Sequence, residues 1–198
     1  MPFYNPFSVF FMYSTISRNE DMILAPDFTE NDIETLKKYF ELNKKYYWRV
    51  NEELTAALTD HPVFGPIMRL MTPEQRRAQN EHSLEQQRAA IYDGKWDEYS
   101  KELITQGRVY ARMNITYSDW YGLIKMYKDH LMPYIKADFD GSVEDAVTFI
   151  DGLTKLVDYA MYGIAEAYFQ EKNAIIKESE ERFRAIFENS VDYIYLVN

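Results

Sequence analysis

The sequence predicts an all-α domain that ends in a long helix. Three observations favour this fold class. Apolar residues recur at helical spacing through most of the chain, helix-capping patterns precede two of these runs, and almost no stretch before Tyr193 alternates as a strand does. With 198 residues, of which 46% are hydrophobic, the chain can form one domain with a full core and a short extra segment.

Residues 1–27 are expected to form an N-terminal aromatic arm and a polar linker. The apolar run at 9–13 is too short to cross a bilayer, and no basic residue precedes it. Pro2 and Pro6 also disfavour a regular apolar helix. We therefore expect an extended arm that packs on the domain or on a partner chain, and no targeting or membrane segment.

The first helical region is expected to start after Thr29. This residue can cap the helix, and Asp32 stands at the third helical position as a capping-box variant. Two apolar runs at helical spacing follow, and they stop at the corner formed by residues 60–62. Beyond the corner, residues 64–66 (Phe-Gly-Pro) predict a turn.

Three more helices are expected before residue 137. Thr72 can cap a helix that runs to about residue 92, with Pro73 in the first turn, where its missing N–H costs no hydrogen bond. Gly94 ends this helix, and two others are predicted at about 96–113 and 118–136.

The last predicted helix is the longest and starts at Val143, after a loop at 138–142. Small and apolar residues form two rows of a heptad pattern along it. Gly152 and Gly163 lie inside this helix, where each glycine costs about 1 kcal/mol relative to alanine. We therefore expect another helix or a ligand to approach the backbone there. Beyond Tyr168 the sequence becomes charged, as is typical of an exposed helix that leaves a domain.

The segment 94–127 carries the most specific pattern in the chain. It contains GKWDEY at 94–99, GRVYAR at 107–112 and the pair Trp120-Tyr121. This order resembles the central segment of the bacterial sensor globins, which belong to the globin-coupled sensor family. The resemblance covers roughly residues 28–171. It implies a globin-like sensor domain at 28–170, within a multidomain bacterial signalling protein.

The resemblance also shows where this chain departs from the haem-binding members. In those members a histidine in the second block is the sole protein ligand of the haem iron, and Tyr110 occupies that position. Thr55 stands where the haem-binding members usually have a tyrosine that donates to bound oxygen. The segment between Tyr110 and Trp120 is one residue longer than in those members. These departures resemble non-haem stressosome sensor globins and small fatty-acid-binding sensor globins. We therefore expect no haem, and a fatty acid or another apolar ligand in the former haem pocket.

Two alternatives stay open. A haem-based gas or redox sensor would use Tyr110 or His82 as the iron ligand, since tyrosinate binds ferric haem in catalase. Arg108 and Arg112 are two residues from Tyr110 and do not share its helix face, so neither is placed to hold a phenolate. The other alternative is a ligand-free dimerisation scaffold. The candidate ligand-binding residues are Tyr110, Met113, His82, Tyr121 and Thr55.

The resemblance implies a homodimer formed by the last two helices. We expect residues 171–190 to be a signalling helix, and residues 179–198 resemble the opening of a PAS domain. Residues 191–198 would then be a truncated start of that domain, with a first strand at 193–197. The heptad face of the last helix suits the dimer interface, and its candidate residues are Ile150, Leu153, Val157, Ala160, Ile164 and Ala167.

Composition excludes several classes of function. The formal net charge of −10 disfavours nucleic acid and anionic membrane surfaces as partners. The absence of cysteine excludes thiol catalysis and disulfides and agrees with a cytoplasmic location. His82 and Glu85 form one i, i+3 pair, and no second pair completes a metal site. Because no phosphate loop or nucleophile motif is present either, we expect neither an enzyme nor a metal centre.

Overall fold

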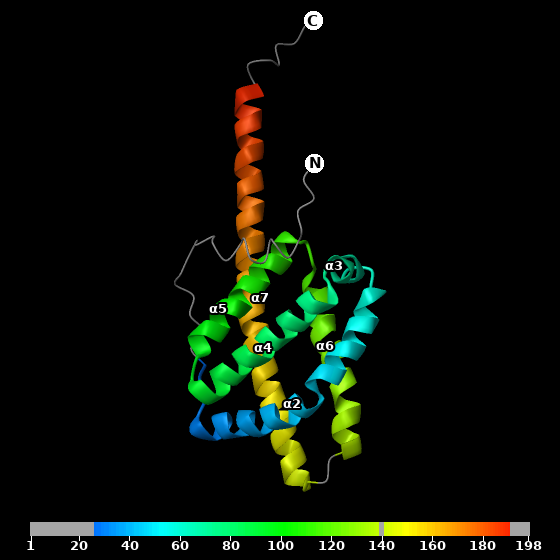
Figure 1. Cartoon of the computed structure of the whole chain (residues 1–198). Helices are drawn as coiled ribbons and strands as arrows, with labels where there is room; N and C mark the ends of the chain where they lie inside the picture. Colours follow the sequence, from blue (N-terminus) through cyan, green and yellow to red (C-terminus); the bar gives the residue numbers. More distant parts are fainter. Residues whose placement is uncertain (1–25, 139–140, 191–198) are drawn as a thin grey trace, which may run out of the picture.

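The computed structural model describes residues 26–138 and 141–190, and within these ranges it contains helices and no strand. The prediction of an all-α fold with a long last helix is confirmed. The aromatic arm and the proposed PAS strand lie outside the described residues. The helices are α2 (Glu30–Thr59), α3 (Gly65–Leu70), α4 (Pro73–Asp93), α5 (Trp96–Arg112), α6 (Tyr117–Asp138) and α7 (Val143–Ser190) (Figure 1).

Helix α2 joins the two predicted apolar runs into one helix of 30 residues. The capping box at its start is confirmed: Thr29 Oγ1 accepts the N–H of Asp32 at 3.2 Å, and Asp32 accepts the N–H of Thr29 at 2.8 Å. Figure 1 shows that α2 changes direction along its length. Its first part packs on α7, where the rings of Tyr39 and Phe149 lie 5.4 Å apart. Its second part faces α4 and α6, and two different neighbours explain the two apolar runs.

The turn predicted at residues 64–66 is instead the start of the short helix α3. Pro66 lies in the first turn of α3, where a missing N–H is tolerated, so this proline does not prevent a helix. His61 supports the entry, because its Nδ1 accepts the backbone N–H of Val63 at 3.2 Å. Gly65 lies against the end of α2, where an added Cβ would stand 2.5 Å from the carbonyl oxygen of Thr59.

Helix α4 begins with a full capping box between Thr72 and Gln75, and it ends at Gly94, whose φ of 69° is left-handed. The same device starts the last two helices. Thr116 accepts the N–H of Asp119 at 3.2 Å before α6, and Ser142 accepts the N–H of Asp145 at 3.2 Å before α7. Short polar signals in the sequence therefore set most of the helix starts.

Helix α7 is the central element, because α5 and α2 both cross it at close range. An added Cβ on Gly107 of α5 would stand 2.3 Å from the carbonyl oxygen of Ile164, and one on Gly152 of α7 would stand 2.8 Å from Cβ of Tyr39. The close approach expected at Gly152 is confirmed. The core around these crossings contains Leu36, Phe40, Val50, Leu103, Trp120, Leu131, Phe149 and Leu156.

Helix α7 continues well beyond the bundle, as Figure 1 shows. Its last contacts with the bundle are polar: Glu171 accepts from Nε of Arg112 at 2.7 Å, and Lys172 donates to Asn114 at 2.8 Å. The side chains from 173 to 188 are exposed. Among the described residues, no helix has the length and apolar character that a membrane crossing requires.

Candidate functional site

A cavity of about 410 Å³ lies inside the helical bundle, and all six helices contribute to its wall. This volume is within the range of about 300–1,000 Å³ that small-molecule sites occupy. Most of the wall is apolar and includes Leu54 of α2, Met68 of α3 and Ile124 of α6. From α7, the wall includes Leu156 and Val157. The cavity therefore touches the helix that leaves the domain.

Several tyrosines line the cavity, and three of them use their hydroxyl groups within the protein. Tyr47 donates to the backbone oxygen of Asn80 at 2.8 Å, and Tyr127 donates to Oδ1 of Asn43 at 2.8 Å. The hydroxyl of Tyr110 is paired with Gln106. Since these polar groups are satisfied, the tyrosines present mainly their ring surfaces to an occupant.

The structure places Tyr110 on the cavity wall, as the resemblance implies. Its ring stacks on that of Trp120, with 6.4 Å between the centroids. Burial raises the pKa of Tyr110 to about 12, the hydrogen bond from Gln106 opposes this rise, and the charge of Glu102 adds to it. Arg112 forms an ion pair with Glu171 of α7. The phenol is therefore held in its neutral form.

The other candidate ligand-binding residues are only partly brought together. Thr55 lines the cavity with Tyr110. Met113 packs on the edge of the core and is not part of the cavity wall, and Tyr121 is 51% exposed beside Tyr117. His82 is exposed on α4 and does not line the cavity either.

Glu102 links His82 and Tyr110 electrostatically at the contact between α4 and α5. Burial raises the pKa of Glu102 above its usual 4.5, while the charge of His82 and a hydrogen bond from Gln86 oppose the rise. The folded state therefore holds this proton at pH values where the unfolded chain has released it. As the pH rises from about 4.5 through the raised folded pKa, Glu102 lowers the stability of the domain.

We expect Glu102→Gln to raise the midpoint of thermal unfolding at pH 7, because the amide keeps the shape of the side chain without the buried charge. The gain disappears at pH 4, where the carboxyl group is neutral in both states. Thermal unfolding followed by circular dichroism at both pH values checks this. The same substitution at Glu81, an exposed residue in the interior of α4, is the control and shifts neither midpoint. A gain of equal size at pH 4 would contradict the assignment.

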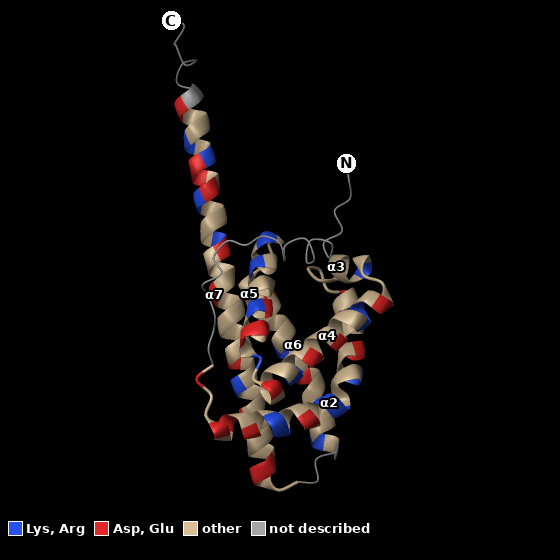
Figure 2. Cartoon of the chain, turned by 60° about the vertical axis from the view of Figure 1, so that its left-hand side comes forward, with Lys and Arg blue, Asp and Glu red and all other residues tan. Residues whose placement is uncertain are grey.

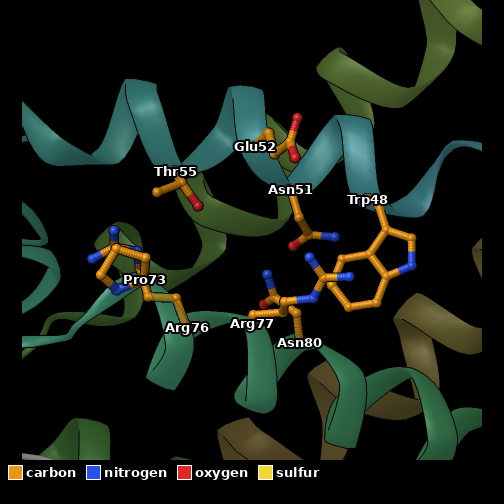
Figure 3. A pocket seen from close by; sticks show the side chains of 8 residues that line it. All are labelled: Trp48, Asn51, Glu52, Thr55, Pro73, Arg76, Arg77 and Asn80. Carbon is orange, nitrogen blue, oxygen red and sulfur yellow. The ribbon is translucent and has the colours of Figure 1, made fainter.

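A second cavity of about 310 Å³ opens between α2 and α4, and six of its eight lining residues have polar or charged side chains (Figure 3). Trp48 and Arg77 lie on its rim, with the guanidinium carbon of Arg77 5.2 Å from the centroid of the Trp48 ring. Sequence analysis singled out neither residue. The only signal was a pair of adjacent arginines on a polar helix, and such pairs usually belong to a solvated face.

The structure also changes the face of α7 that a second chain can reach. Leu153, Ile164 and Ala167 are buried against the other helices of the same chain, so they present no surface to a partner. Val157 and Ala160 line the first cavity, of about 410 Å³. Of the six predicted interface residues, only Ile150 is exposed, at 50%. The heptad pattern read in this region describes packing within the domain.

Comparison with models of protein families gives a match between residues 17–174 and the family described as Protoglobin. The chain belongs to the protoglobin family. This assignment agrees with the helical architecture and supports the globin resemblance read from residues 94–127. Comparisons with curated proteins and with solved structures found no match.

Membership of a globin family implies haem, whose iron needs a donor side chain on the cavity wall. No histidine lines either described cavity: His61 accepts from the backbone in the corner before α3, and His130 bonds to the carbonyl oxygen of Met126 at 2.8 Å. Tyr110 is on the wall, but its environment favours the neutral phenol over the phenolate that binds ferric iron. In the described part of the chain, no group of three or more acidic or histidine side chains could hold another metal ion.

Proposed function

We propose that this protoglobin domain is the sensory domain of a multidomain bacterial sensor, and that it binds a small apolar ligand in place of haem. The observation that carries the proposal is that Leu156, Val157 and Ala160 of α7 form part of the cavity wall. The same helix then runs out of the bundle to Ser190. A ligand in the cavity would thus contact the element that connects the domain to a downstream PAS module.

The signal would be a change in helix packing. Helix α7 is held between α2 and α5 at two glycine crossings, and the cavity lies beside it. A ligand that fits one arrangement of α7 better than another shifts the equilibrium between them by its difference in affinity. Where α7 leaves the bundle, Arg112 donates to Glu171 of α7, and Lys172 of α7 donates to Asn114. A movement of α7 relative to α5 would change these two contacts.

The side chains that could bind the haem iron support the proposal of a site without haem. Tyr110 replaces the imidazole of the resembled family, burial keeps its phenol neutral, and the guanidinium of Arg112 is committed to Glu171. His82 lies outside the cavity wall. The apolar and aromatic wall suits a hydrophobic ligand, since apolar surface is what such a ligand buries on binding.

We also propose that two chains pair through the exposed face of α7. Along the outer face of α7, four large apolar side chains recur at intervals of seven residues and are all more than half exposed: Tyr162, Phe169, Ile176 and Phe183. Such a row supplies one of the two apolar positions in each heptad of a left-handed coiled coil. Both acidic and basic residues lie on the part of α7 that extends from the bundle, as Figure 2 shows. A second copy of the chain in parallel register would cover this row.

The neutral fluorescent probe N-phenyl-1-naphthylamine tests the ligand site. We expect its emission to rise on binding, and Val157→Phe to weaken binding about tenfold or more because the larger side chain fills the cavity. Val147→Phe is the matched control, since Val147 is 60% exposed on the same helix. Equal binding by both variants would overturn the cavity as the binding site.

Haemin tests the absence of haem. We expect the absorption spectrum to remain that of free haemin when haemin is added to the purified protein, with a haem-binding sensor globin as the positive control. A sharp Soret band that saturates at a one-to-one ratio would overturn this part of the proposal. Tyr110→Phe and His82→Ala would then show which side chain binds the iron.

A further inference from the structure

We propose that a series of four packed aromatic rings couples the cavity of about 410 Å³ to the dimer interface of α7. The ring series runs from the cavity wall to the exposed heptad row and consists of Tyr110, Trp120, Tyr117 and Phe169. This inference rests on the proposed function, because it needs a ligand in the cavity and a second chain on α7. It adds the regulation of both sites, since each partner would alter the binding of the other.

Each step of the ring series is a direct contact between two side chains. The ring of Tyr110 in α5 stacks on that of Trp120 in α6, with 6.4 Å between the centroids. The ring of Tyr117 in α6 meets Trp120 edge-on at 4.9 Å and stacks on Phe169 of α7 at 5.9 Å. All three distances lie within the range of about 4.5–7 Å that favourable aromatic pairs occupy. The four rings therefore make one continuous contact across α5, α6 and α7.

The two ends of the ring series face different partners. Tyr110 lines the cavity, where a ligand can contact it. At the other end, Phe169 is 53% exposed in the heptad row, where a second chain can contact it. Because Tyr110 replaces the iron-ligating histidine of the haem-binding members, a coupling along this route needs no metal.

Trp120, in the middle of the ring series, is held by packing. Its side chain is 1% exposed, yet within the described part of the chain its indole nitrogen has no hydrogen-bond partner. A buried donor without a partner raises the free energy of the orientation in which it stands, so a second orientation of this ring lies closer in free energy. Since protein interiors are close-packed, a shift of Tyr110 caused by a ligand is passed to Trp120 and from there to Tyr117.

Sedimentation equilibrium with and without saturating N-phenyl-1-naphthylamine tests the coupling. We expect the bound probe to change the dissociation constant of the native dimer by about tenfold, and dimerisation to change the affinity for the probe in turn. Tyr117→Leu removes the ring between Trp120 and Phe169, so the effect of the probe should fall below about twofold. The coupling is a ratio of two dissociation constants of the same variant, so an effect of the substitution on dimerisation alone cancels.

Tyr121→Leu is the matched control and should keep the full effect of the probe. Tyr121 is 51% exposed, and among the described residues its ring contacts that of Tyr117 but not those of Trp120 or Phe169. A full effect in Tyr117→Leu, an equal loss in both variants, or a native dimer unaffected by the bound probe would overturn the coupling and leave the cavity as a ligand site. If the probe does not bind, or the native chain stays monomeric, that part of the proposed function fails, and the coupling fails with it.

Discussion

Gly107→Ala is expected to lower the free energy of unfolding by about 3 kcal/mol, at the upper end of what overpacking usually costs. The added Cβ would stand 2.3 Å from the carbonyl oxygen of Ile164 and 3.0 Å from Cβ of Ala167. The first of these is a backbone atom in the middle of α7, which cannot rotate away as a side chain can. To accept one methyl group, α5 and α7 must separate along their crossing. Urea unfolding followed by circular dichroism measures the loss.

Gly122→Ala is the matched control for this substitution. Gly122 also lies inside a helix, α6, but an added Cβ there meets nothing within 4 Å. Because alanine favours a helix more than glycine does, we expect a gain of about 0.5–1 kcal/mol. A difference of about 3–4 kcal/mol between the two variants then measures the close crossing alone. Equal effects of the two substitutions would mean that α5 and α7 are not packed as closely as described.

Ile176→Glu is expected to weaken dimerisation by about 100-fold or more, which corresponds to about 2.7 kcal/mol. Ile176 is 55% exposed and stands in the middle of the heptad row, so the substitution would place a carboxylate from each chain in the apolar seam. The bundle makes no use of this side chain, and the monomer should therefore keep its thermal stability. Sedimentation equilibrium over a range of protein concentrations gives the dissociation constant.

Ala174→Glu serves as the control for the dimer. It adds the same charge two residues earlier, at an exposed position on a different face of α7. We expect the dissociation constant to stay within about twofold of that of the native chain. A native protein that remains monomeric at high concentration would reject the coiled coil. A dimer that withstands Ile176→Glu would place the interface on another surface.

The caps at Thr116 and Ser142 show that the start of a helix can be predicted from local sequence. Each is followed three residues later by an aspartate, and each forms a capping box in the structure. These interactions join residues three apart, so local sequence is enough to predict them. Local sequence did not predict the short helix α3, because Gly65 and Pro66 favour a turn by local rules alone.

The candidate site also has features that local sequence predicts and features that it does not. The position of Tyr110 on the cavity wall follows from the blocks at 94–112, because a resemblance in residue order carries the arrangement of the family with it. The pairing of Trp48 with Arg77 joins two helices across a gap of 29 positions, and no periodic pattern in the chain reports it. A pair of this kind becomes visible only when α2 and α4 are placed side by side.

The sequence by itself determined the helical fold class, most of the helix boundaries and the presence of tyrosine where the resembled family has histidine. These features depend on residues close together in the chain or on a shared order of residues. Only the tertiary structure decided which face of α7 is free. Leu153 and Ile164 belong to the apolar heptad rows of α7, whose spacing is compatible with either a dimer interface or a domain core. The close crossing of α5 and α7 at Gly107 shows that these residues belong to the core. Tyr162 and Phe169 are exposed because the bundle covers the opposite side of α7, whereas Ile176 and Phe183 are exposed because α7 has left the bundle there.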